Sequence, residues 1–123
     1  MKRFLLLLLL GTMAMATAKP AEPIDLWFVY RNGCKACRQM KARLENPSVA
    51  KVLKRSYRLH MVDVHQQNKL PSRLPRTHTV PTLYFVDAHG RQIIRPIHNI
   101  TTLAFWKTLK RAEDIRDGRK PGR

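Results

Sequence analysis

The feature that most constrains this chain is a short segment that contains both of its cysteines. Cys34 and Cys37 are separated by two residues, and they follow the apolar segment Ile24 to Tyr30 after a brief turn. That segment is rich in aromatic and β-branched residues, which predicts a buried strand. From Cys34 onward, apolar residues recur at spacings of three and four, which predicts a helix. The cysteine pair therefore falls at the junction of a strand and a helix.

Such a pair can crosslink a structure, bind a metal or exchange electrons. A disulfide between Cys34 and Cys37 closes a very short loop, so as a crosslink it removes little entropy from the unfolded chain. A structural zinc site normally has four Cys or His ligands. The chain has two cysteines, and only His60 and His65 form a close histidine pair. We therefore predict no metal site, and a redox-active center that needs no organic cofactor.

The position of the pair predicts a division of labour between the two thiols. The start of a helix is electropositive and offers unpaired N–H groups, and both stabilise a thiolate. Arg31, Lys35 and Arg38 lie close in the sequence and add positive potential that tunes the thiol pKa. We predict that Cys34 is the exposed nucleophile and that Cys37, one helical turn later, is the buried resolving thiol.

The rest of the chain predicts alternating strands and helices. Asn46 and Pro47 interrupt the first helix and begin a second one, with Asn46 as its N-cap. Further strands are predicted at residues 57–64, 80–86 and 91–97, with a polar loop at 65–79, a hairpin turn at 87–90 and a last helix at 101–114. A helical crossover predicts a parallel pair, and a hairpin predicts an antiparallel one. The prediction is an α/β fold with a mixed four-stranded sheet flanked by helices.

Two motifs together resemble the thioredoxin superfamily. GCKAC after an apolar strand is followed by TVPT, residues 79–82, at the start of another strand, and then by YFVDAHGR. The resemblance covers about residues 24–114 and implies a thioredoxin-like three-layer fold. In that superfamily the proline of the second motif is a cis-proline beside the cysteines, which helps to bind the substrate backbone. Pro81 matches it, so the resemblance implies that Pro81 and Val80 form the substrate-binding site.

Within the superfamily, the run GCKACRQMKARLENPSVAKVLKR is most similar to small exported thioredoxin-like proteins and to the periplasmic thioredoxin domain of transmembrane disulfide reductases. Two positions depart from the thioredoxin pattern. Gly33 stands where a tryptophan commonly precedes the first cysteine, and Phe28 stands where thioredoxin carries a buried acid. In thioredoxin that acid assists proton transfer at the buried thiol. Its replacement by Phe28 leaves open whether this protein reaches the catalytic turnover of thioredoxin.

The N-terminus has the layout of a secretory signal peptide. The basic residues Lys2 and Arg3 precede an apolar run at 4–10, and a small-x-small site ends at Ala18. The apolar run is too short for an ordinary membrane-spanning helix. We predict cleavage after Ala18, a domain at 19–115, a basic disordered tail at 116–123 and a periplasmic location. The alternative is an N-terminal anchor that is not cleaved.

The charge of the chain is strongly positive. Lys and Arg number 24 against 8 acidic residues, a formal net charge of +16. The basic residues are spread along the chain and an exported protein rarely meets nucleic acid, so we predict attraction to anionic envelope surfaces and no nucleic-acid binding. The predicted function is a monomeric, exported thiol:disulfide oxidoreductase that acts on protein disulfides with an upstream redox partner, and reduction is the favoured direction. The alternative is a thioredoxin-fold adaptor or chaperone-like module whose disulfide is passive.

Overall fold

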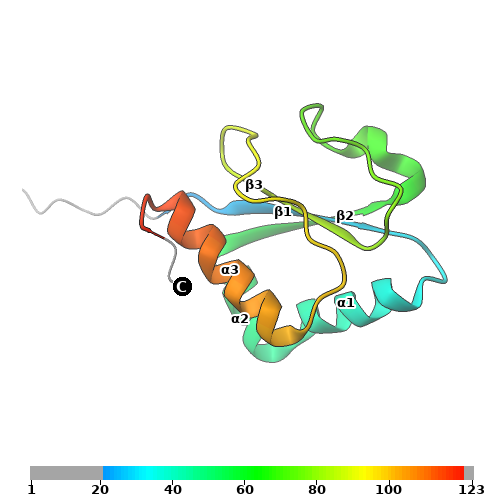
Figure 1. Ribbon diagram of the computed structural model, residues 1–123, viewed down its shortest axis with the longest axis horizontal. Coiled ribbons are helices and arrows are strands. Elements are labelled where there is room, and N and C mark those ends of the chain that lie inside the picture. The colour runs from blue at the N-terminus through cyan, green and yellow to red at the C-terminus, as the bar shows by residue number, and fades with distance from the viewer. Residues whose placement is uncertain (1–20, 121–123) are drawn as a thin grey trace, which may run out of the picture.

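The computed structural model describes residues 21–120, which form a sheet with helices packed against it (Figure 1). The predicted signal peptide and residues 121–123 lie outside this range. The elements in chain order are β1 (Ile24–Tyr30), α1 (Lys35–Glu45), α2 (Pro47–Ser56), β2 (Tyr57–Asp63), the 3-10 helix η1 (Val64–Lys69), β3 (Thr82–Val86) and α3 (Thr102–Arg116). No helix within 21–120 is long and apolar enough to cross a membrane.

The strand β1 lies in the middle of a mixed sheet whose order is β2-β1-β3. It pairs in parallel with β2, where Ile24 faces Tyr57 and Tyr30 faces Asp63, and it pairs antiparallel with β3. The helices α1, α2 and α3 lie on one face of the sheet, and η1 lies on the other (Figure 1). The predicted α/β fold, mixed sheet and helical crossover are confirmed.

The predicted fourth strand at residues 91–97 is wrong. This segment runs antiparallel beside β3 but pairs with it only at isolated positions. Leu83 and Ile97 exchange two backbone hydrogen bonds of 2.8 and 3.1 Å, and the Ile93 N–H donates to the Phe85 carbonyl at 2.9 Å. The described sheet therefore has three strands rather than four.

The reason is a mismatch in length between the two segments. From Leu83 to Phe85 the strand β3 advances by two residues, whereas the segment beside it uses four residues from Ile93 to Ile97. The extra residues must bulge out of the ladder, which interrupts regular pairing. Pro96 lies within this bulge, and it has no N–H to donate to a neighbouring strand.

Apolar side chains form two clusters, one on each face of the sheet. The larger cluster lies toward the helices and contains Ile24, Leu26, Phe28, Met40, Leu44, Val49, Leu53, Leu83, Phe85, Phe105 and Leu109 together with both cysteines. The smaller one lies toward η1 and contains Val29, Val62, Leu70, Leu74, Tyr84 and Val86. Every residue of β3 is buried, as expected for a strand that is covered on both faces.

Local capping accounts for the helix boundaries. The Asn46 side chain accepts hydrogen bonds from the N–H groups of Ser48 at 3.1 Å and Val49 at 3.5 Å, so it caps α2 as predicted. Because Pro47 has no N–H, it suits the first position of this helix. The last helix reaches Arg116, so the segment predicted as a tail begins inside α3 and is described as far as residue 120.

Candidate functional site

The cysteine pair lies where β1 turns into α1. Gly33 has φ +77°, a left-handed conformation that residues with a Cβ rarely adopt. Cys34 is the N-cap of α1 with an extended backbone, and its Sγ accepts a hydrogen bond from the Cys37 N–H at 3.1 Å. Cys34 Sγ is thus the hydrogen-bond acceptor at this helix start, where the oxygen of a Ser, Thr, Asn or Asp side chain is the usual acceptor. The predicted position of the pair at the strand-to-helix junction is confirmed.

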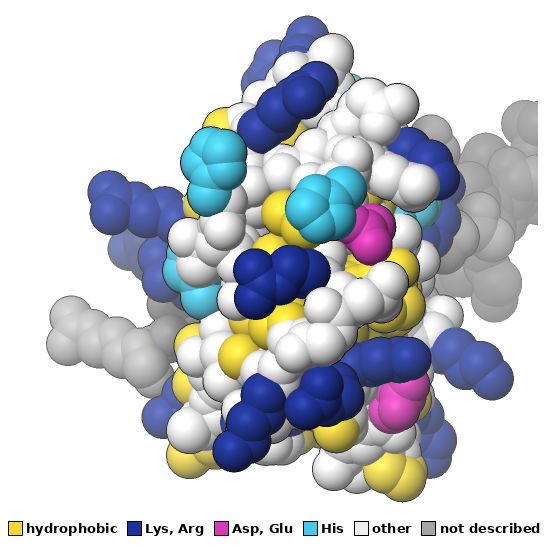
Figure 2. All heavy atoms as spheres, turned by 90° about the vertical axis from the view of Figure 1, so that its right-hand side faces the viewer, with side chains coloured by type: hydrophobic (Ala, Val, Ile, Leu, Met, Phe, Trp, Pro, Cys, Tyr) yellow, Lys and Arg dark blue, Asp and Glu magenta, His cyan; other side chains and the backbone are white. Residues whose placement is uncertain are grey.

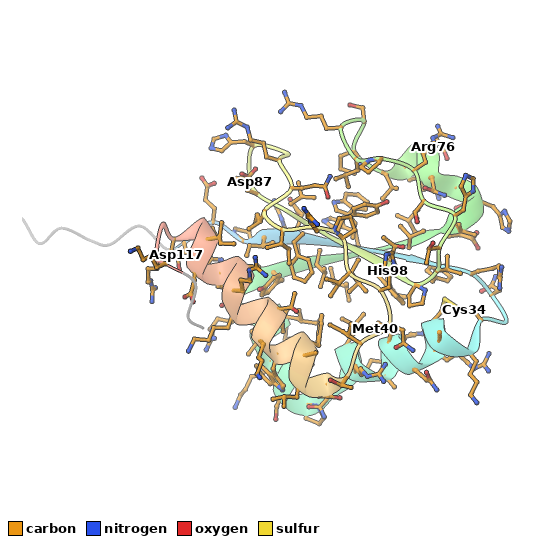
Figure 3. All side chains as sticks on the ribbon, in the orientation of Figure 1. Cys34, Met40, Arg76, Asp87, His98 and Asp117 are labelled. Atoms are coloured by element: carbon orange, nitrogen blue, oxygen red, sulfur yellow. A yellow bond between two sulfur atoms is a disulfide. The ribbon has the colours of Figure 1, made fainter. Side chains whose placement is uncertain are left out.

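Cys34 and Cys37 form a disulfide with a Cα–Cα distance of 5.2 Å, which is within the usual range. Both residues are nearly covered: Cys34 is 8% exposed and Cys37 is 4% exposed. The prediction of an exposed Cys34 is therefore wrong for this oxidised form, because both side chains pack into the larger apolar cluster. Cys34 is nevertheless the more exposed of the two, and it lies at the outer end of α1 (Figure 3).

Reduction of this disulfide would leave Cys34 at an electropositive position. The Cys37 N–H already points at Sγ, and the first turn of α1 contains no acidic residue. A hydrogen bond to a thiolate and the helix dipole both stabilise the negative sulfur. On the buried side the neighbours are apolar, since Phe28 belongs to the same cluster as both cysteines.

The three basic residues predicted to tune the thiol lie close to the start of α1, with Arg31 in the turn before the helix and Lys35 and Arg38 within it. Arg31, Lys35 and Arg38 are all exposed. The backbone carbonyl of Arg31 accepts a hydrogen bond from the Cys34 N–H at 3.4 Å. Through solvent, each exposed charge stabilises a nearby anion by only a few tenths of a kcal/mol. The helix start and the Cys37 N–H therefore stabilise a Cys34 thiolate more than these three side chains do.

The chain before β3 comes back to the cysteine end of the molecule. The Val80–Pro81 peptide bond is cis, and Pro81 is buried. Val80 is half-buried and packs against the larger apolar cluster, which contains Cys34 and Cys37, as well as against the smaller one. The structure therefore brings the two motifs together, although more than 40 residues separate them in the sequence.

His98 lies beside Pro81, a contact that sequence reasoning missed. Its Nδ1 is 3.2 Å from the Pro81 carbonyl oxygen and 3.2 Å from Thr82 Oγ1. The sequence carries no signal for this contact, because it depends on the irregular path of residues 91–97. No group of three Cys, His, Asp or Glu side chains within 21–120 is arranged to hold a metal ion.

The loop that leads to Pro81 is tied to η1 by one side-chain amide. Gln67 donates to the Thr77 carbonyl at 2.7 Å and accepts from the Thr77 N–H at 2.8 Å. Thr82 Oγ1 donates to the Thr79 carbonyl at 2.6 Å and also meets Thr77 Oγ1. These bonds satisfy the polar backbone of a loop that has no regular secondary structure.

A hollow of about 370 Å³ opens between the turn after β1, η1 and this loop, and we call it the basic hollow. Its lining includes Arg31, His65, Gln67, Arg76, His78 and Val80. Figure 2 shows this end of the molecule: Lys, Arg and His side chains are spread over it, and acidic side chains are few. The sequence carries no signal for this hollow, since its residues come from three separate segments.

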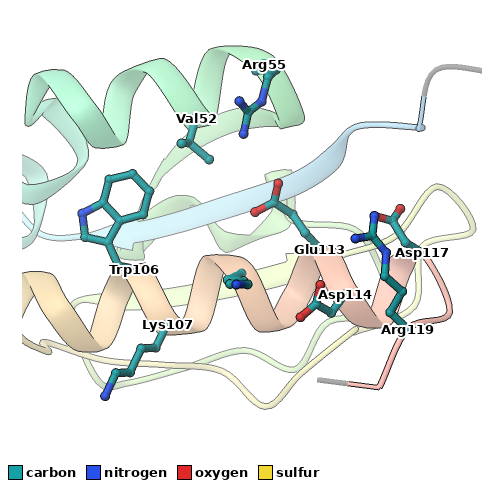
Figure 4. Close-up of a pocket in the computed structure, with 9 residues that line it drawn as sticks. Val52, Arg55, Trp106, Lys107, Glu113, Asp114, Asp117 and Arg119 are labelled. Atoms are coloured by element: carbon teal, nitrogen blue, oxygen red, sulfur yellow. The ribbon is translucent and has the colours of Figure 1, made fainter. Parts of the chain in front are cut away.

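A second hollow, of about 460 Å³, lies between α2 and α3 (Figure 4). None of its lining residues belongs to the cysteine site. Its charges are mixed, since it is lined by three acids and four bases: Glu113, Asp114, Asp117, Arg55, Lys107, Lys110 and Arg119. A lining that mixes acids and bases does not select a ligand of either sign, so we place no chemistry there.

No protein-family model matches the sequence, and no curated protein matches it. Solved structures do match. The thioredoxin Deadhead (Thioredoxin-1) of Drosophila melanogaster is 16% identical with a TM-score of 0.57, over 72% of this chain and 79% of that chain. A thioredoxin from Thermus thermophilus is 22% identical with a TM-score of 0.55, over 71% of each chain. A thioredoxin-fold protein from Helicobacter pylori is 18% identical with a TM-score of 0.57, over 82% and 73%.

At these identities the likeness shows the fold. The chain has the thioredoxin fold, with a Cys-x-x-Cys disulfide at the start of the helix that follows its central strand. The fold class implied by the sequence resemblance is therefore confirmed, with three described strands in place of four.

Proposed function

We propose that this protein is a thiol:disulfide oxidoreductase that works through Cys34 and Cys37. The observation that carries the proposal is the Cys34–Cys37 disulfide at the N-terminus of α1, with the Cys37 N–H donating to Cys34 Sγ. A helix start that stabilises a thiolate, next to a second thiol one turn away, is what disulfide exchange requires.

The proposed reaction transfers two electrons. In the dithiol form, the Cys34 thiolate attacks one sulfur of a client disulfide and releases the other client sulfur as a thiolate, which takes up a proton. The Cys37 thiol then loses its proton and attacks Cys34 Sγ. This step breaks the mixed disulfide, releases the second client thiol and forms the Cys34–Cys37 bond. The client disulfide is reduced and the protein dithiol is oxidised. An upstream redox partner restores the dithiol.

We further propose that the protein works in the reducing direction and outside the cytoplasm. The absence of a histidine between the cysteines and the similarity to exported reductase domains favour reduction. The signal-like segment that ends at Ala18 supports export to the periplasm, and the mass of the mature N-terminus, expected at Lys19, tests it. Val80, which packs against the larger apolar cluster with both cysteines, and Pro81, whose carbonyl oxygen lies 3.2 Å from His98 Nδ1, would shape the client-docking site.

Trapping of a covalent intermediate tests the activity. A Cys37→Ala variant should accumulate mixed disulfides through Cys34 in cells, visible as bands that disappear when a reductant is added. The control is the double variant Cys34→Ala, Cys37→Ala, which should form none. A Cys37→Ala protein that forms no adduct above this control would favour the alternative, a thioredoxin-fold adaptor with a passive disulfide.

The direction has a separate test. Thiols are alkylated in intact cells, and the redox state of the pair is read from a shift on a gel. We expect the pair to be largely dithiol when its electron donor is present. A pair that is oxidised at steady state, together with loss of client disulfides when the protein is deleted, would mean that the protein is an oxidase.

A further inference from the structure

We propose that the basic hollow binds an acidic side chain of the client polypeptide, so that clients with Asp or Glu near the reacting cysteine are preferred. This inference rests on the proposed function and names a class of substrate for it. Its observations are the charge of the hollow, its place beside the cysteine pair and the hydrogen bonds that hold its walls.

The charge of the hollow is positive and is not neutralised. Arg31 and Arg76 line it together with His65 and His78, and no acidic residue does. All 8 acidic residues of the chain belong to the described part, and none of them forms an ion pair with Arg31 or Arg76. A guanidinium group offers a planar set of N–H donors that matches a carboxylate.

The nearest acid in the sequence does not compete for these groups. Asp63 is the N-cap of η1, and its side chain accepts a hydrogen bond from the His65 N–H at 2.8 Å. It is absent from the lining of the basic hollow. An acidic side chain that enters the hollow would therefore find arginine donors without a carboxylate partner.

The hollow lies within reach of a client held at Cys34. Arg31 is three residues before Cys34, so their Cα atoms are at most about 10 Å apart. Val80 also lines the hollow, and it packs against the cluster that contains both cysteines. An extended client spans about 3.4 Å per residue. A client residue two to four positions from its cysteine can therefore place its side chain in the hollow.

The walls of the hollow are held in place by hydrogen bonds. Thr77, which lies between Arg76 and His78, makes two backbone bonds to the Gln67 side chain in η1. The Tyr84 hydroxyl donates to the carbonyl of Pro75, the residue before Arg76, at 2.6 Å. These bonds fix the backbone that carries Arg76 and His78, so the loop itself loses less entropy when a carboxylate binds.

The shape of the site favours a side chain over a flat anionic surface. A hollow of about 370 Å³ is concave, and its arginines come from two separate segments, one in the turn after β1 and one in the loop before β3. A flat bilayer would meet exposed lysines and arginines over the whole surface and would not single out these two. We therefore assign the hollow to a carboxylate of the client chain.

The test compares two synthetic peptides that each contain one intramolecular disulfide. One carries Glu two and three residues after the first cysteine, and the other carries Gln at the same positions. The readout is the ratio of the second-order rate constants for reduction of the two peptides by the full dithiol protein at low salt. With the unmodified protein, we expect the Glu peptide to be reduced about tenfold faster than the Gln peptide. Each of the two arginines contributes a factor of about three to this ratio.

The variants locate the effect. Arg76→Gln should lower the ratio to about threefold, and the pair Arg31→Gln, Arg76→Gln should bring it near one. The matched control is Arg111→Gln, which removes one exposed charge on α3, outside the hollow, and should keep the ratio of the unmodified protein. Raising the salt to about 0.5 M should lower the ratio, because partly exposed charges are screened.

Several results would overturn the inference. If both peptides are reduced at equal rates, the hollow does not read acidic clients, while the proposed function stands. If Arg111→Gln lowers the ratio as much as Arg76→Gln, the preference reflects overall charge and not this site. Binding to anionic phosphatidylglycerol vesicles that needs both arginines, with a peptide ratio of one, would assign the hollow to membranes instead. If neither peptide is reduced, the proposed function fails, and this inference fails with it.

Discussion

Replacing Tyr57 by Phe should lower the free energy of unfolding by about 1 kcal/mol at neutral pH. Tyr57 is the first residue of β2 and is buried. Its hydroxyl donates to the Leu109 carbonyl of α3 at 2.7 Å, and its ring meets Phe85 edge to face at 6.2 Å. The variant loses one neutral hydrogen bond, worth about 0.5–1.5 kcal/mol, and keeps the aromatic contact. Tyr57→Ala loses the ring as well and should cost about 3–5 kcal/mol.

The same substitution should change how stability depends on alkaline pH. Burial, and then the charge of Glu113, raise the pKa of Tyr57 above its ordinary value. Below about pH 10 the folded and unfolded chains both keep the hydroxyl proton, so the contribution of this group is complete. Above that pH only the unfolded chain loses it, and the free energy of unfolding falls by about 1.4 kcal/mol per pH unit. Tyr57→Phe lacks this proton, so its stability should fall less steeply.

Urea unfolding of the disulfide form, followed by circular dichroism at pH 7, 10 and 11, measures both effects. Burial also raises the pKa of Tyr84, so part of the alkaline slope should remain in Tyr57→Phe. The control is Tyr30→Phe, since the Tyr30 hydroxyl makes no hydrogen bond to the described residues; its neutral-pH stability should change by less than about 0.5 kcal/mol. Equal slopes in the unmodified protein and Tyr57→Phe above pH 10 would refute the reasoning.

Disulfide exchange should be unchanged in Tyr57→Phe. Tyr57 pairs with Ile24 at the start of β1, whereas the cysteines follow the other end of that strand. A change in the exchange rate of Cys34, at a pH where the variant is fully folded, would show that the two ends of the sheet are coupled.

Two further predictions concern helix ends. Asn46→Ala should destabilise the protein by about 1 kcal/mol, since two N–H groups of α2 lose their side-chain acceptor; an unchanged urea midpoint would mean that Pro47 alone maintains the junction. At the end of α3, the hydrogen bond from Arg116 lowers the pKa of Asp117. The resulting stabilisation, under about 1 kcal/mol for such an exposed pair, is present above about pH 4 and is lost as the pH falls through the folded pKa. Asp117→Asn should therefore lose less stability than the unmodified protein between pH 5 and 2, and identical curves would contradict this.

The elements that the sequence predicted well are those whose signals are local. The bounds of β1 coincide with the apolar run that ends at Tyr30, and Asn46 caps α2 beside Pro47. The position of Cys34 at a helix start also follows from its neighbours, because the periodicity of α1 begins there. In each case the interacting atoms belong to residues that are close in the sequence, so the local pattern predicts the structure without knowledge of the fold.

The mistaken strand at residues 91–97 shows that strand pairing cannot be predicted from local sequence alone. Its composition suits a strand, yet whether it pairs depends on the residues of β3 that it must match in length. The covered state of Cys34 was missed for the same reason, since its neighbours in the larger apolar cluster come from across the chain.

By itself, the sequence determined the buried strand at residues 24–30, the helix that begins at the cysteines and the junction of the first two helices, because turn, cap and periodicity signals act between near neighbours. Only the tertiary structure decided which distant segments meet at the site. It placed His98 against Pro81, and it gathered Arg31 and Arg76 around one hollow beside the cysteine pair. Such contacts depend on the packing of the sheet against η1 and on the path of irregular loops, and no short stretch of sequence encodes either.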